Sequence, residues 1–143
     1  MRAKEELVQL EEIERQIKMN LALVDHYRDM AAKCTATISD MPKGGGTGDK
    51  VGSYALLAVE AEYRLDRLQD DYYKLTQEIK QTLDAMTTKD EATAENYRNI
   101  LRYKYLCGMK WQEVADKMGY SLRHTTKMHG WALVEYEKVM QKK

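Results

Sequence analysis

The sequence predicts an all-α protein, and three observations carry that prediction. The 143-residue chain has one proline, Pro42, and gathers four of its eight glycines at residues 44–48. The stretches on either side repeat apolar residues in alternating three- and four-residue steps, the period of a helix face. Trp111 to Leu133 has the spacing of two helices joined by a tight turn. We therefore expect a long antiparallel, coiled-coil-like helical hairpin, residues 1–87, followed by a trihelical helix-turn-helix domain, residues 88–143.

The two helices of the hairpin are expected at residues 4–35 and at about residues 53–86. Asn20 and Thr82 are the lapses in their apolar stripes. The remaining stripe positions are Leu10, Ile13, Ile17, Val24, Tyr27, Ala31 and Cys34, then Tyr54, Ala58, Ala61, Leu65, Leu68, Tyr72, Leu75, Ile79 and Met86. The helices would be joined by the glycine-rich loop at residues 42–50. A phosphate-binding loop needs a preceding strand and a hydroxyl residue after its lysine, whereas Val51 follows Lys50. This loop is thus expected to connect helices, not to bind a nucleotide.

An additional set of apolar residues falls outside the two stripes. Surplus apolar surface on a long hairpin indicates either a partner or packing against the C-terminal domain, and both alternatives stay open at this point. The set comprises Leu7, Leu56, Leu57, Val59, Tyr63 and Tyr73.

A third helix is expected to follow residues 86–90, where the apolar stripe stops. Thr88 followed by Glu91 fits a capping box, which predicts a start near Lys89 or Asp90. Gly108 fits the left-handed residue after a helix end. The expected buried face comprises Ala94, Tyr97, Leu101 and Tyr105, with Ile100 and Leu106 beside it.

The fourth and fifth helices form the predicted helix-turn-helix. Lys110 and Trp111 begin the fourth helix, Gly119 suits a turn residue with positive φ, and Ser121 can cap a fifth helix that runs to Met140. The residues expected to be buried in this unit are Val114, Met118, Tyr120 and Met128, with Ala115 at the helix crossing and Thr125 and Ala132 also facing inward.

Charge is distributed unevenly along the chain. Residues 1–90 hold 13 basic and 17 acidic residues, whereas residues 91–143 hold 10 and 6. Between Lys117 and Val134 there is no acidic residue. A basic segment that coincides with the second helix of a helix-turn-helix is what attraction to DNA phosphates requires.

The second helix of the motif, about residues 121–135, is expected to lie in the major groove. Arg can bond guanine bidentately, Thr can contact a thymine methyl or a base edge, and Lys serves base or phosphate. Ser121 and the helix N-terminus suit a phosphate. The candidate DNA-binding residues are Lys110, Ser121, Leu122, Arg123, His124, Thr126 and Lys127.

Catalytic and metal-binding patterns are missing from the sequence. His124 and His129 are five residues apart and do not share a helix face, and Cys34 and Cys107 have no metal-like spacing. No stretch of about 18 apolar residues indicates a membrane span. We expect a non-enzyme with no cofactor, no metal and no membrane partner.

Residues Ile100 to Leu133, ILRYKYLCGMKWQEVADKMGYSLRHTTKMHGWAL, resemble the region-four helix-turn-helix of bacterial sigma factors. The shared features are a Leu-rich entry helix, a Gly, an acid before Val114–Ala115, then Gly119, Ser121 and Ala132–Leu133. The chain as a whole resembles small phage and prophage regulators of the RinA/ArpU type. That resemblance implies a sigma-like activator of late phage genes. Sigma factors usually have Glu, Arg and Val where this chain has Arg123, His124 and Thr125, so the same promoter sequence is not expected.

The expected function is sequence-specific DNA binding by a transcription regulator in the cytoplasm of a bacterial host cell. Double-stranded DNA is the expected partner, and the hairpin allows two more, RNA polymerase and a second copy of the chain. Two alternatives remain. One is an interaction protein that binds polymerase without binding DNA specifically, and the other is a phage DNA-packaging adaptor, a class that also combines a helix-turn-helix with a coiled coil.

Overall fold

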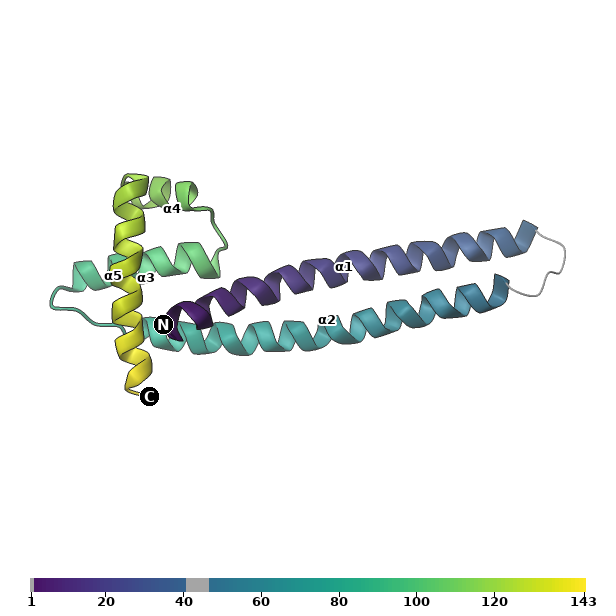
Figure 1. The fold of residues 1–143 in the computed structure, drawn as a ribbon, viewed down its shortest axis with the longest axis horizontal. Helices are drawn as coiled ribbons and strands as arrows, with labels where there is room; N and C mark the ends of the chain where they lie inside the picture. The colour runs from purple at the N-terminus through teal and green to yellow at the C-terminus, as the bar shows by residue number, and fades with distance from the viewer. Residues whose placement is uncertain (1, 41–46) are drawn as a thin grey trace. The chain divides into compact units, whose positions relative to one another are not determined.

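A computed structural model describes the backbone of residues 2–40 and 47–143 and the side chains of residues 2–34 and 50–143. All regular elements in these ranges are helices, as the sequence predicts, and Figure 1 shows their order. They are α1 (Arg2–Asp40), α2 (Thr47–Asp84), α3 (Glu91–Leu101), the π-helix η1 (Arg102–Leu106), α4 (Trp111–Met118) and α5 (Leu122–Gln141). Within the described residues, no helix is both long and apolar enough to cross a bilayer.

The two long helices extend further than the apolar stripes predict. α1 continues to Asp40 instead of ending at residue 35, and α2 begins at Thr47 instead of residue 53. The β-branched and short polar residues between Thr35 and Ser39 lower helix propensity by only a few tenths of a kcal/mol each, which does not stop a helix already formed. Part of the expected loop at residues 42–50 therefore belongs to α2, and the rest, up to residue 46, lies outside the described residues.

The chain forms two compact units whose limits differ from the expected division at residues 87 and 88. One unit consists of residues 1–12 and 73–143, and the other of residues 13–72. Residues 2–12 of α1 and 73–84 of α2 thus pack with the C-terminal helices. Fully buried side chains of both long helices, such as Leu7 and Leu83, contribute to that core.

In the unit of residues 13–72, α1 and α2 lie side by side and run antiparallel (Figure 1). Ala58 and Ala61 are fully buried, so small side chains allow the two helices to approach closely. The Arg28 guanidinium pairs with Glu62 across the two helices. Asn20, a lapse in the apolar stripe, is 2% exposed; its Nδ2 donates to Gln16 O (2.8 Å) and its Oδ1 accepts from Arg64 Nε (3.4 Å).

The surplus apolar set divides between the two alternatives. Leu7 is fully buried in the unit that contains the C-terminal helices, so for this residue the alternative of packing against the C-terminal domain holds. The other members stay exposed, with Tyr63 at 72% and Tyr73 at 65%. The exposed members in the other unit are Leu56, Leu57, Val59 and Tyr63.

The core of the C-terminal unit is built from all of its helices. α5 packs against both α3 and α4. Thr82, the other lapse, is also buried, and its Oγ1 donates to Glu78 O (3.0 Å) and accepts from Lys143 Nζ (2.5 Å). The largest fully buried apolar side chains are Leu7, Leu10, Ile79, Leu83, Met86, Ile100, Leu101, Val114 and Tyr136.

α3 begins where the sequence predicts, but another residue caps it. The expected capping box of Thr88 and Glu91 is wrong: Asp90 is the N-cap, and its Oδ1 accepts from the Ala92 N–H (3.3 Å). Thr88 instead donates its hydroxyl to Asp90 O (2.5 Å). An Asp directly before the first helical turn meets the free amides better than a residue two positions earlier.

Arg98 is a buried residue on α3 that the stripe pattern does not reveal. Its guanidinium donates to Met86 O (2.7 Å) and to Glu95 (2.8 Å), and it also pairs with Glu91. These partners raise the pKa of Arg98, the hydrogen bond to Glu95 most of all, and the same bond lowers the pKa of Glu95. Arg98 thereby ties the end of α2 to α3. Tyr97, expected on the buried face, is only half-buried.

The expected third helix changes type before it ends. α3 stops at Leu101 and the chain continues as η1, with the Cys107 N–H donating to Arg102 O (2.9 Å). A π-helix carries one extra residue per turn, so it shifts the face that later side chains occupy. Gly108 follows with φ +68°, which confirms the predicted left-handed residue.

Candidate nucleic-acid interface

The connection between α4 and α5 has the geometry that the sequence predicts. Gly119 has φ +75°, and the Tyr120 N–H reaches back to Ala115 O (3.1 Å), the bond that closes a left-handed helix end. Ser121 is the N-cap of α5, and its Oγ accepts from the His124 N–H (3.1 Å). α4 and α5 are thus two helices joined by a three-residue turn.

One side of α5 faces the core. Thr125 and Ala132 are fully buried and Met128 is 5% exposed, as predicted. The Thr125 hydroxyl donates to Ser121 O (2.8 Å), so it needs no further partner inside the protein. The opposite side of the N-terminal half of α5 is therefore directed away from the core.

The exposed side carries most of the candidate DNA-binding residues. Arg123, Thr126 and Lys127 are exposed, and so are Ser121 and Leu122, the latter at 43%. Among the described residues, no hydrogen bond or ion pair engages the side chain of Arg123 or Lys127. Their charges and donors are consequently available to a ligand.

The hydroxyl of Thr126 is already engaged within the helix. Its Oγ1 donates to Arg123 O (2.9 Å), one turn back along the helix. Because the hydroxyl proton is used within the helix, the exposed methyl and the remaining lone pair are what this residue offers. An apolar contact with a thymine methyl is the pairing that suits it.

His124 lies apart from the row of exposed residues Arg123, Thr126 and Lys127. It is half-buried, with its ring edge-on to Tyr120 (centroids 4.9 Å apart) and to Trp131 (6.3 Å). This arrangement places His124 in an aromatic cluster on one flank of α5. The prediction that Tyr120 is buried is wrong, because its side chain is 38% exposed. Its Oη accepts a hydrogen bond from Asn96 Nδ2 (3.5 Å). Met118 is half-buried instead of buried.

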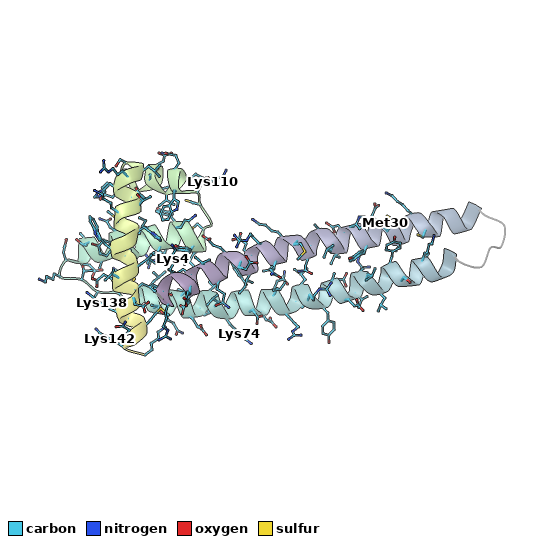
Figure 2. All side chains as sticks on the ribbon, viewed as in Figure 1. Lys4, Met30, Lys74, Lys110, Lys138 and Lys142 are labelled. Carbon is cyan, nitrogen blue, oxygen red and sulfur yellow. The ribbon has the colours of Figure 1, made fainter. Side chains whose placement is uncertain are left out.

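Lys110 lies immediately before α4 and is exposed (Figure 2). It is the N-cap residue by position, in extended conformation, and its side chain makes no capping bond. A lysine at a helix N-terminus adjoins free backbone amides, and together they suit an anion. The structure thus brings Arg123, Thr126 and Lys127 into one exposed row on α5, while Lys110 lies at the N-terminus of the neighbouring α4.

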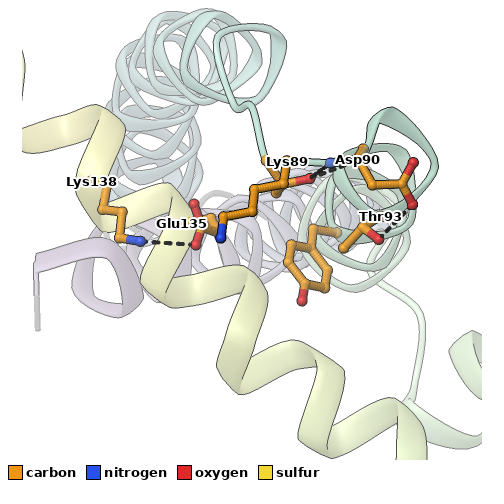
Figure 3. A pocket seen from close by; sticks show the side chains of 7 residues that line it. Lys89, Asp90, Thr93, Glu135 and Lys138 are labelled. Atoms are coloured by element: carbon orange, nitrogen blue, oxygen red, sulfur yellow. Dashed lines mark hydrogen bonds and ion pairs between the residues drawn. The ribbon is translucent and has the colours of Figure 1, made fainter.

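The hollows of the C-terminal unit were not predicted. One, of about 400 Å³, lies between the start of α3 and the second half of α5 (Figure 3). Many of its polar groups bind one another: Lys138 pairs with Glu135 (3.1 Å), and Thr93 donates to Asp90 (3.1 Å). Its lining has no single sign of charge, so it offers little to a charged ligand. The residues around it are Thr88, Lys89, Asp90, Thr93, Tyr97, Glu135 and Lys138.

A second hollow, of about 340 Å³, adjoins the exposed row through Thr126 and reaches His129. His129 Nε2 and Tyr105 Oη form a hydrogen bond (2.8 Å), and the Trp111 ring lies edge-on to the imidazole (4.5 Å between centroids). Burial, followed by the nearby Lys4 and Lys104, lowers the pKa of His129 to about 4. His129 is therefore neutral near pH 7. Sequence periodicity could not find this hollow, because Lys4 lies more than a hundred residues away in the chain.

No group of three or more His, Cys, Asp or Glu side chains within the described ranges could hold a metal ion. No protein-family model, curated protein or solved structure matches this chain.

Proposed function

We propose that this chain is a sequence-specific DNA-binding transcription regulator. The observation that carries the proposal is the exposed row of Arg123, Thr126 and Lys127 on the N-terminal half of α5, in a segment without acidic residues. This is the half of a second helix that enters the major groove in helix-turn-helix proteins. An α-helix with side chains fits that groove, which is about 12 Å wide.

Each residue of the interface has a distinct role in this proposal. Arg123 reads guanine through two hydrogen bonds, Thr126 meets a thymine methyl, and Lys127 contacts a base or a phosphate. Ser121, Leu122 and the first amides of α5 lie against the backbone, and Lys110 neutralises a phosphate beside α4. His124 supports the flank of the helix through its contacts with Tyr120 and Trp131.

The regulatory role comes from the resemblance to sigma region four and to regulators of the RinA/ArpU type. This resemblance implies that the chain is a sigma-like activator of phage or prophage genes and that RNA polymerase is a further partner. Arg123, His124 and Thr125 occupy positions where sigma factors carry other residues, so the chain would bind an operator of its own.

An electrophoretic mobility shift with promoter DNA tests the proposal. The double variant Arg123→Ala/Lys127→Ala should lose most of the specific affinity, because each base contact supplies about 1–3 kcal/mol of discrimination. The matched control is Lys74→Ala/Lys142→Ala, which removes two exposed cations from elsewhere in the same unit (Figure 2). If both double variants bind as the wild type does, the interface assignment is wrong.

Single variants separate base reading from phosphate contact. Arg123→Ala should relax the preference at one base pair, whereas Lys110→Ala should weaken binding to all sequences equally and make the salt dependence shallower by about one contact. A chain that binds polymerase but shows no salt-dependent DNA binding would support the polymerase-binding alternative instead.

A further inference from the structure

The hollow beside Thr126 is formed by four separate elements of the C-terminal unit. α1 contributes Lys4, Val8 and Glu11, and η1, α4 and α5 contribute the other walls. Its volume of about 340 Å³ is within the range of small-ligand sites. The residues from the last three elements are Lys104, Tyr105, Trp111, Thr126 and His129.

Two lysines give the hollow a positive potential. Lys104 Nζ lies 5.1 Å from the centre of the Trp111 ring and 3.5 Å from Met109 O, so its ammonium is held in place. Glu11 is the only acid in the lining, and its Oε1 is 3.8 Å from Lys104 Nζ. Lys4 is exposed at the rim. The lining thus carries two ammonium groups and one carboxylate, of which Glu11 pairs with Lys104, and the neutral His129 adds no charge.

Titration of the imidazole supports the same sign of potential. Lys4 and Lys104 both lower the pKa of His129, after the larger effect of burial. The two ammonium groups thus favour an anion near the imidazole, whereas burial and the Glu11 carboxylate raise the pKa of Tyr105 to about 12 and disfavour negative charge on its phenol. The Trp111 ring and the Val8 side chain form the apolar part of the lining.

The hollow also lies at the edge of the proposed interface. Successive residues of an α-helix are about 100° apart, so Thr126 and His129 occupy adjacent positions on one flank of α5. Thr126 belongs to both the exposed row and the hollow, and Trp111 directly follows Lys110. With α5 in the major groove as proposed, this flank adjoins the DNA-facing row.

We propose that this hollow binds a phosphate group, with Lys4 and Lys104 as its cationic ligands. The phosphate belongs either to the DNA backbone, in which case the inference rests on the proposed function, or to a free phosphate or phosphorylated small molecule. In the first case the start of α1 is part of the DNA-binding surface. In the second, an effector binds next to the recognition helix.

The phosphate arm of the test uses Trp111 as a reporter. In a Trp131→Phe background, inorganic phosphate is titrated at constant ionic strength and Trp111 fluorescence is recorded. A free-phosphate site gives a saturable change that Lys4→Gln weakens about tenfold, the loss expected for one charge-assisted hydrogen bond. Lys74→Gln, an exposed lysine outside the hollow, leaves it unchanged.

Glu11→Gln provides a variant of opposite sign. It removes the carboxylate that faces Lys104 and should strengthen phosphate binding, a gain that a damaged fold cannot produce. This result would distinguish a charge effect from the loss of packing that Lys104→Gln could cause.

The DNA arm compares salt dependence. If the phosphate is part of DNA, Lys4→Gln makes the slope of log K against log [salt] shallower by about 0.9, and Lys74→Gln does not. Dependence on Lys4 in either titration supports the inference and identifies the source of the phosphate. Wild-type behaviour of Lys4→Gln and Glu11→Gln in both titrations overturns it. If the wild type binds no DNA, the proposed function fails, and the phosphate titration alone decides this inference.

Discussion

The first and second halves of α5 belong to one continuous helix but present different surfaces. Residues 122–131 carry Arg123 and Lys127 on an exposed side and contain no acid. Residues 132–141 contain Glu135 and Glu137 and bury Tyr136 completely. The second half is thus fixed in the core by its buried side chains, whereas the first half keeps one side, with Arg123 and Lys127, exposed.

The second half is anchored by contacts with the start of α1. Tyr136 Oη donates to Glu6 Oε1 (2.6 Å), and the Ala3 N–H donates to Glu137 Oε2 (2.6 Å). Burial, together with the bond to Glu6, raises the pKa of Tyr136, so the phenol stays protonated and keeps donating. Variants of the buried side chains in the second half should consequently change stability, and variants of the exposed Arg123 and Lys127 in the first half should change binding.

Tyr136 offers the largest expected effect. Tyr136→Ala should lower the free energy of unfolding by about 3–5 kcal/mol, the cost of removing a buried aromatic side chain. Tyr136→Phe should cost about 1–2 kcal/mol, because it leaves the Glu6 carboxylate without its donor. Urea denaturation measures both values. Equal stability of Tyr136→Ala and the wild type would show that this half of α5 does not anchor the helix.

The two glycines of this region should respond to alanine in opposite directions. Gly119 has φ +75°, so Gly119→Ala should lower the free energy of unfolding by about 1–2 kcal/mol through backbone strain. Gly130 is within α5 and a Cβ there meets no atom within 4 Å, so Gly130→Ala should stabilise by about 0.5–1 kcal/mol. Thermal unfolding of both variants checks this pair. The same sign for both would contradict the turn geometry.

The cap of α5 should make a smaller contribution. Ser121→Ala removes the acceptor for the His124 N–H and should cost about 1 kcal/mol, whereas Ser121→Gly should cost only a few tenths. Circular dichroism during thermal unfolding resolves this difference. If Ser121→Ala unfolds at the wild-type temperature, the cap bond contributes nothing to the first half of the helix.

A further expected effect concerns pH. His129 has a folded-state pKa of about 4, below its ordinary value of 6.5, because burial and two lysines disfavour its charge. As pH falls, His129 therefore binds a proton in the unfolded chain before it does so in the folded chain. The stability contributed by neutral His129 is consequently lost between about pH 6.5 and pH 4. His129→Gln should show a shallower loss of stability over that window, measured by urea denaturation at several pH values. A loss as steep as that of the wild type would contradict this assignment.

Local rules were enough to predict the turn between α4 and α5. Gly119 and Ser121 act through their own φ angle and their own hydroxyl, so the sequence reveals them without knowledge of the rest of the fold. The same holds for the inward side of Thr125 and Met128, which follows from helical period alone. This is why most of the candidate interface was predictable.

Features that depend on distant parts of the chain were not predictable. Arg98 interrupts no apolar pattern in an obvious way, and only its packing against the end of α2 buries it. Leu7 and Lys4 lie beside the C-terminal helices because of tertiary packing, which no local pattern encodes. Asn20 and Thr82 looked like breaks in the stripes, although each is buried with its polar atoms hydrogen-bonded.

Selection from a random double-stranded DNA library tests the central claim most directly, since it asks about binding and specificity together. The wild-type chain should enrich one short sequence, and Arg123→Ala should enrich it with a relaxed preference at one position. Tyr136→Phe, which changes the anchoring half of α5, should enrich the same sequence as the wild type. Recovery of no sequence above the starting library would contradict the assignment of α5 as a DNA-reading helix.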